Sequence, residues 1–145
     1  MSEISSSPVH LPWAAPRTQA LLVLAYSTGA AALAAEGAVH IREYVTLVHV
    51  VAWIGPLFLA NAAACAATVI GLALRPTRRL AALTGVVISA LALGGLVVSY
   101  GQGLFGWREA GFRTSIAVAV ISAVVAAIAL TLALAVSAAG PRATR

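Results

Sequence analysis

Four long apolar stretches alternate with short polar segments along the chain. They cover residues 18–35, 45–74, 80–100 and 115–136. An α-helix of about 20 apolar residues crosses the roughly 30 Å of hydrocarbon in a bilayer. The pattern therefore predicts an all-α protein, an integral membrane four-helix bundle. The predicted spans are about 18–38, 50–74, 80–100 and 114–136.

The second apolar stretch is too long for a straight crossing, because its residues 45–74 would form a helix of about 45 Å. The pair Gly55-Pro56 disfavours a continuous helix, since proline lacks a backbone donor and restricts the residue before it. Residues 56–74 are enough to span alone. We therefore expect 45–54 to be a tilted, kinked or interfacial extension, in which His49 and Trp53 suit a membrane–water boundary.

Composition agrees with a membrane protein. Apolar residues make up 61% of the chain and charged residues 9%, whereas a soluble domain carries about 25% charged residues. The basic residues are all arginines and do not cluster on an aromatic-rich soluble face, so we expect no nucleic-acid partner. The single cysteine, Cys65, excludes an internal disulfide and a zinc site built on a cysteine pair.

The arginines predict the orientation of the spans. With four spans, one side holds the two tails and the second loop, with Arg17, Arg75, Arg78, Arg79, Arg142 and Arg145. The other side holds Arg42, Arg108 and Arg113. Because short cytoplasmic loops are enriched in arginine, both termini are predicted to be cytoplasmic and the protein to lie in the cell membrane. Residues 1–17 are then a disordered cytoplasmic tail and 138–145 a second cytoplasmic tail.

A signal peptide is the alternative interpretation of the first apolar stretch. Residues 32–34 read Ala-Leu-Ala, which suits a signal peptidase after an apolar run. Cleavage there would leave three spans.

Polar residues collect just after the first span. Glu36, His40 and Glu43 are spaced by four and three, so they share one face if the first helix continues outward. Together with His49 they form a candidate metal site or proton relay, because carboxylates and imidazoles serve both roles. The spacing is not a known zinc pattern. A solvated helix cap and a site for a partner or small ligand therefore stay open as alternatives.

A second set of polar residues is predicted to line a path or to join helices. The set is Asn61, Thr68, Ser99, Gln102, Arg108 and Glu109. Asn61 and Thr68 lie on one face of the second span, and a buried amide needs a hydrogen-bond partner. The loop at 99–113 holds four glycines and four aromatic residues, which suit a turn seated in the interface.

Two contacts between segments are also expected. The outer loops lie on the same predicted side, so Arg108 or Arg113 should pair with Glu36 or Glu43. The third span carries Gly85 and Ser89 at a spacing that lets helices approach closely. We therefore expect the third span to be the central packing element.

Residues 35–44 (AEGAVHIREY), followed by 55–61 (GPLFLAN), resemble a family of uncharacterised small four-helix membrane proteins of high-GC bacteria. Members carry a His-x-x-Glu-Tyr element after the first span and a Gly-x-Leu-Phe-Leu-type second span. The resemblance covers roughly residues 20–136. It implies the same topology and singles out His40, Glu43 and Tyr44, but it implies no activity.

The sequence contains no nucleotide motif and no arranged Ser-His-Asp set, so the favoured function is a non-enzymatic accessory or structural membrane subunit. One alternative is a small oligomeric transporter or channel. The sequence places no ionisable residue clearly in mid-membrane, where transport pathways usually have one, and this argues against that alternative. Another is a metal-, haem- or quinone-binding membrane protein that uses His40 and His49. No cofactor is implied. The expected partners are membrane lipid and either a second copy of the chain or another membrane protein.

Overall fold

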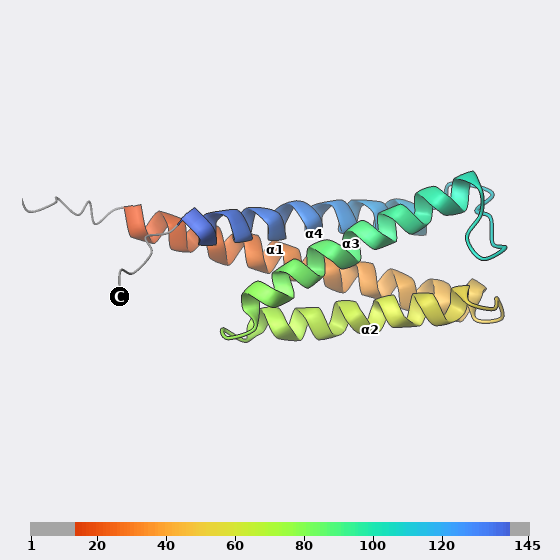
Figure 1. The fold of residues 1–145 in the computed structure, drawn as a ribbon, viewed down its shortest axis with the longest axis horizontal. Coiled ribbons are helices and arrows are strands. Elements are labelled where there is room, and N and C mark those ends of the chain that lie inside the picture. The colour runs from red at the N-terminus through yellow and green to blue at the C-terminus, as the bar shows by residue number, and fades with distance from the viewer. Residues whose placement is uncertain (1–13, 140–145) are drawn as a thin grey trace, which may run out of the picture.

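The computed structural model describes residues 14–139, which form an antiparallel bundle of four helices (Figure 1). In chain order the elements are α1 (Ala14–Glu43), the π-helical segment η1 (Tyr44–Val48), α2 (Ile54–Ala73), α3 (Arg78–Gly101) and α4 (Thr114–Ala139). Each of the four helices is long and apolar enough to cross a membrane. The predicted all-α four-helix fold is therefore confirmed. Most of both predicted tails, with Arg142 and Arg145, lies outside the described residues.

The first helix is longer than the sequence pattern predicted. It passes the expected end at residue 38 and continues through η1, because residues 37–48 contain no proline and Glu43 and Val48 are buried in the bundle. The N–H of His49 donates to the carbonyl oxygen of Tyr44 at 3.0 Å, which closes the wide turn. The expected extension at 45–54 is thus divided between the end of this helix and a turn.

The break before the second helix lies close to the predicted one. Trp53 has φ of 68°, and α2 begins at Ile54. Pro56 falls in the first turn of α2, where its missing N–H is not needed. Gly55 lies against η1, because a Cβ there would be 2.8 Å from the carbonyl oxygen of Val48.

The bundle has two distinct ends. The turn end contains residues 74–77, the start of α1 and the end of α4. The loop end contains the turn at 49–53 and the loop at 102–113 (Figure 1). α1 packs along α4 and α2 but hardly touches α3. The expectation that the third span is the central packing element is therefore wrong, because α1 makes the most extensive contacts.

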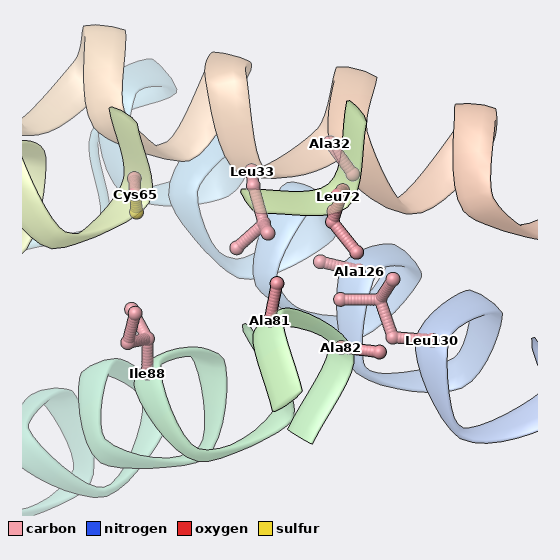
Figure 2. Packing of buried hydrophobic residues seen from close by; sticks show 9 residues of the cluster. All are labelled: Ala32, Leu33, Cys65, Leu72, Ala81, Ala82, Ile88, Ala126 and Leu130. Carbon is pink, nitrogen blue, oxygen red and sulfur yellow. The ribbon is translucent and has the colours of Figure 1, made fainter. Parts of the chain in front are cut away.

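Leu130 of α4 holds three helices together. It is fully buried in the apolar cluster drawn in Figure 2. A Cβ added at Gly29 of α1 or at Gly85 of α3 would lie 2.5 Å from a methyl carbon of Leu130. The two glycines thus leave the space that this side chain fills, as expected where close packing rather than hydrophobic transfer drives helix association.

Arginines cap helices at the turn end. The Nε of Arg78 donates to the carbonyl oxygen of Leu72 at 2.8 Å, and Nη2 of Arg79 donates to that of Ser137 at 3.1 Å. The guanidinium of Arg78 also lies 5.4 Å from the ring centroid of Tyr26. These contacts satisfy carbonyls that the last turns of α2 and α4 leave open.

Candidate functional site

Glu36 lies in the interior of the bundle. Its exposed fraction is 0%. The Nδ2 of Asn61, from α2, donates to its Oε1 at 3.5 Å, and the Oγ of Ser89, from α3, donates to its Oε2 at 3.0 Å. The carboxyl group therefore joins three helices through hydrogen bonds.

The depth of Glu36 corresponds to the middle of the spans. Ser89 lies at the midpoint of α3. Glu36 itself is four residues, or about 6 Å of helix rise, from the centre of the apolar segment Pro16–Val48. The interpretation of Glu36 as part of a solvated cap is therefore wrong, and Glu36 is an ionisable residue inside a candidate membrane span. A charged carboxylate at this depth costs about 3 kcal/mol or more unless it is compensated.

The surroundings of Glu36 supply no positive charge. α2 and α4 contain no lysine, arginine or histidine, and those of α3 are confined to its first turn. Within residues 14–139, the ion pairs in the structure do not involve Glu36. Its partners are the neutral amide of Asn61 and the hydroxyl of Ser89.

His40 follows Glu36 by one helical turn, and its ring orientation is fixed. Its Nδ1 lies 2.8 Å from the carbonyl oxygen of Glu36. A carbonyl only accepts, so Nδ1 carries the proton and Nε2 of the neutral ring is an acceptor. The imidazole also lies 4.9 Å from the ring of Phe58, measured between centroids.

Glu43, Arg113 and Glu109 form a charged cluster near the loop end. Nη1 of Arg113 lies 3.1 Å from Oε2 of Glu43, and Nη2 lies 3.1 Å from Oε2 of Glu109. The predicted pairing of an arginine of the second outer loop with a glutamate of the first is confirmed for Arg113 and Glu43. The Nε of Arg113 is buried and has no hydrogen-bond partner.

A cavity of about 410 Å³ lies between the helices in the loop-end half of the bundle. α2 and α3 diverge toward that end (Figure 1). Its walls are mainly apolar and come from all four helices and the loop at 102–113. Its polar lining includes His40, Glu43, Asn61, Ser99, Glu109 and Arg113. Asn61 therefore separates the cavity from the carboxyl group of Glu36.

The cavity also reaches the outside of the bundle. Leu57 of α2 and Leu91 of α3 line it and are nevertheless 44% and 70% exposed. Leu91 is near the middle of α3. An opening between α2 and α3 at this level would face acyl chains in a bilayer.

The structure does not bring the four predicted metal ligands together. Within residues 14–139, no group of three or more histidine, cysteine, aspartate or glutamate side chains is arranged to hold a metal ion. Glu36 and Glu43 have different partners, and His49 is exposed in the turn, with its ring 6.4 Å from that of Tyr44. Glu36, His40 and Glu43 do lie along one face of α1, as predicted for a helix that continues outward.

The predicted polar set divides between the bundle interior and its surface. Asn61, Ser99 and Glu109 line the cavity, and the carbonyl oxygen of Ser99 accepts from the N–H of Glu109 at 3.2 Å. Thr68 is buried against α3, where its methyl group would lie 3.4 Å from a Cβ at Gly85. Gln102 caps α3 through its own N–H and is exposed, as is Arg108.

Two aromatic residues of the cavity wall were not predicted as site residues. Phe58 and Trp107 line the cavity from α2 and from the loop. Each belongs to an apolar or aromatic stretch that has an ordinary membrane interpretation, so no separate signal in the sequence distinguishes them.

No protein-family model, curated protein or solved structure matches the chain.

Proposed function

We propose that the chain is a multi-pass protein of the cell membrane that binds a membrane-soluble amphiphile in the cavity between α2 and α3. The observation that carries this proposal is the cavity itself, with a volume of about 410 Å³ and apolar walls. Ligand pockets commonly measure about 300–1,000 Å³ and combine apolar walls with a few polar groups. The lateral opening beside Leu57 and Leu91 gives a ligand dissolved in the bilayer a direct way in.

The polar lining supports a ligand that carries a polar head group. Nε2 of His40 offers an acceptor, and the unpaired Nε–H of Arg113 offers a donor. An apolar molecule without a head group would leave that buried donor unsatisfied, at a cost of about 1–3 kcal/mol. The apolar walls accommodate the rest of the molecule.

In this proposal the protein has no catalytic reaction of its own and acts as a binding subunit. Both termini are cytoplasmic, because the turn end carries Arg75, Arg78 and Arg79. The cavity then opens into the outer half of the bilayer. Lipid, a second copy of the chain or another membrane protein covers the exposed apolar faces. Reporter fusions at Arg145 and in the loop at Gly106 test this orientation, which fails if the Gly106 fusion reports a cytoplasmic position.

Photo-crosslinking with a neutral diazirine-labelled fatty alcohol tests the binding site. We expect peptide mapping to find the label on cavity-lining segments of α2 and α3. Ala92→Trp fills the cavity and should abolish this labelling, whereas Ala90→Trp, on the exposed side of the same helix, should not. Circular dichroism establishes that both variants are folded. Labelling that is uniform over the lipid-facing surface, or equal in both variants, would refute the proposal.

Transport of the ligand is a second candidate function, and the position of Glu36 favours it. Ionisable residues inside membrane spans mark ion and substrate pathways more often than structural contacts. Uptake of radiolabelled tetraphenylphosphonium into proteoliposomes with an imposed pH gradient distinguishes the two functions. Uptake in excess of that into protein-free liposomes supports a transporter, because this lipophilic cation also crosses bare bilayers, and binding without such excess uptake supports a binding subunit.

A further inference from the structure

We infer that the ligand of the cavity is an uncharged lipid whose head group both donates and accepts hydrogen bonds, as a hydroxyl group does. This inference rests on the proposed cavity function and names the chemical class of the ligand. Three observations carry it: the acceptor nitrogen of His40, the guanidinium of Arg113, and the balance of charge in the cavity lining.

The first observation is that His40 offers the ligand a hydrogen-bond acceptor. Its Nδ1 is engaged with the carbonyl oxygen of Glu36 at 2.8 Å, which leaves Nε2 of the neutral ring as an acceptor. His40 lines the cavity, and within residues 14–139 no other group bonds to this nitrogen. The ring of Phe58, 4.9 Å away between centroids, packs against the imidazole. A ligand without a donor would leave the acceptor unsatisfied.

The second observation is that Arg113 offers donors. Its Nη1 and Nη2 each lie 3.1 Å from a carboxylate oxygen, of Glu43 and Glu109 respectively. Its Nε has no partner in the part of the chain that the structure describes. A guanidinium has five N–H groups, and this side chain lines the cavity and is 40% exposed. Donors are therefore left for an acceptor on the ligand.

Glu43 connects these two groups. Residues three apart on a helix are neighbours, with their Cβ atoms about 5–6 Å apart, and His40 and Glu43 have this spacing on α1. Glu43 is in turn paired with Arg113. The acceptor of His40 and the donors of Arg113 thus meet near the loop end of the cavity, where one head group contacts both.

The third observation is the sign of the charge in the cavity lining. Glu43 and Glu109 contribute two negative charges and Arg113 one positive charge. This net negative lining repels an anionic head group. An ammonium head group has no acceptor for Arg113. A hydroxyl group carries no charge, donates to His40 through its hydrogen and accepts from Arg113 through its oxygen.

The arrangement of the walls matches the orientation of a lipid in a bilayer. The polar groups lie toward the loop end, and apolar walls continue toward Leu91, near the middle of α3. With its head group at His40 and Arg113, the ligand directs its hydrocarbon chain toward the middle of the bilayer. It can therefore enter between α2 and α3 without turning over.

Competition against the diazirine-labelled fatty alcohol tests this class, with the full chain in lipid nanodiscs at about pH 8, where free imidazole is neutral. The competitors are dodecanol, its methyl ether, dodecane, dodecanoate and dodecyltrimethylammonium, compared at equal mole fractions in the bilayer. The ether accepts without donating, dodecane does neither, and the last two are ions. We expect dodecanol to displace the cavity label at a mole fraction roughly fivefold or more below that of the ether, because the ether leaves Nε2 of His40 unpaired. Dodecane and both ions should compete less well than dodecanol.

His40→Phe isolates the role of the acceptor. Phenylalanine keeps a ring beside Phe58 but offers no acceptor nitrogen, so the advantage of dodecanol over the ether should fall to about one. Each ratio is measured within one variant, so a general change in affinity cancels. His49→Phe, at an exposed position outside the cavity lining, is the matched control and should keep the wild-type ratio. Circular dichroism establishes that both variants are folded, and the competitor series in the wild type decides the class by itself if His40→Phe does not fold.

The outcomes separate this inference from the proposed function. If the fatty alcohol labels the cavity but the methyl ether competes as well as dodecanol, or either ion competes better, the ligand class is overturned and the cavity function stands. An unchanged ratio in folded His40→Phe would overturn the role of His40 as the acceptor. If the fatty alcohol does not label the cavity, the cavity function itself fails.

Discussion

The packing of Leu130 between Gly29 and Gly85 predicts a strong coupling between substitutions at two of these positions. In the wild-type background, Gly85→Ala adds a Cβ 2.5 Å from the Cδ1 of Leu130 and 3.0 Å from that of Leu33. Leu130 is fully buried and already fills the space that Gly29 leaves on the α1 side, where an added Cβ would also lie 2.5 Å from one of its methyl carbons. In a Leu130→Ala background the same Cβ finds open space on the α4 side.

The magnitudes follow from packing alone. In a membrane the unfolded reference already places leucine in lipid, so the transfer contribution is small and the cavity contribution dominates. Leu130→Ala removes three carbon atoms, or roughly 80 Å³, and should destabilise the bundle by about 2 kcal/mol. Gly85→Ala should cost about 1–3 kcal/mol by overpacking in the wild type. After Leu130→Ala it should cost less than about 1 kcal/mol. The expected coupling energy is about 1–2 kcal/mol.

Reversible unfolding in mixed micelles of dodecyl maltoside and SDS, followed by circular dichroism, measures the four free energies of this cycle. Gly94→Ala is the matched control, because a Cβ at Gly94 meets no atom within 4 Å. The helix-propensity gain of alanine is present in both backgrounds and cancels in the cycle. If Gly85→Ala lowers the unfolding free energy by the same amount, within about 0.5 kcal/mol, in the wild type and in Leu130→Ala, then Leu130 is not the side chain that packs against Gly85.

Three further predictions concern the ends and the interior of the bundle. Glu43→Arg should lower the unfolding free energy by about 1 kcal/mol, and adding Arg113→Glu should restore most of that loss. A larger loss is not expected because the ion pair is partly exposed, and a double variant no more stable than Glu43→Arg alone would argue against the pairing. Arg78→Gln should destabilise the bundle by about 1 kcal/mol in the same micelle assay, because it removes the guanidinium donors that cap α2. Arg75→Gln, at an exposed position, should leave the stability unchanged, and equal effects of the two substitutions would contradict the capping role. Cys65 is 1% exposed, so a maleimide should modify it in SDS but not in the folded bundle, and mass spectrometry showing fast modification of the folded protein would contradict this burial.

Sequence reasoning predicted the fold because the lengths of apolar stretches carry most of the information. A run such as 115–136 has one simple interpretation at bilayer thickness, and the structure places α4 there. The end of the first helix was harder to predict. Glu36 and Glu43 favour a water-exposed helix end, since acidic residues usually mark one. The helix continues past both because each is buried with partners from other segments.

The candidate site shows the same division between local and distant information. The common face of Glu36, His40 and Glu43 followed from helical spacing. The partners of Glu36 did not, because Asn61 is 25 residues away and Ser89 is 53 residues away. One local signal was available: an acidic residue followed by an apolar Gly-Ala-Val, with no helix breaker, is compatible with a carboxyl group inside a span. The face of α3 that contacts the Glu36 carboxyl group depends on how the helices pack together, and the spacing of residues along the sequence does not predict it.

The wide turn of η1 has a consequence for how this chain can change its length. Glu43 and Val48 are buried at 8% and 2% exposure although they are five residues apart. In a regular α-helix five residues rotate a side chain by about 140° beyond a full turn, so one of the two would face outward. The π turn accommodates the additional residue and keeps both inside. Deleting one residue between 44 and 48 would convert the segment to a regular α-helix and rotate the turn at 49–53 away from its contact with Gly55. The number of residues in this segment is therefore more tightly constrained than their identity among apolar side chains.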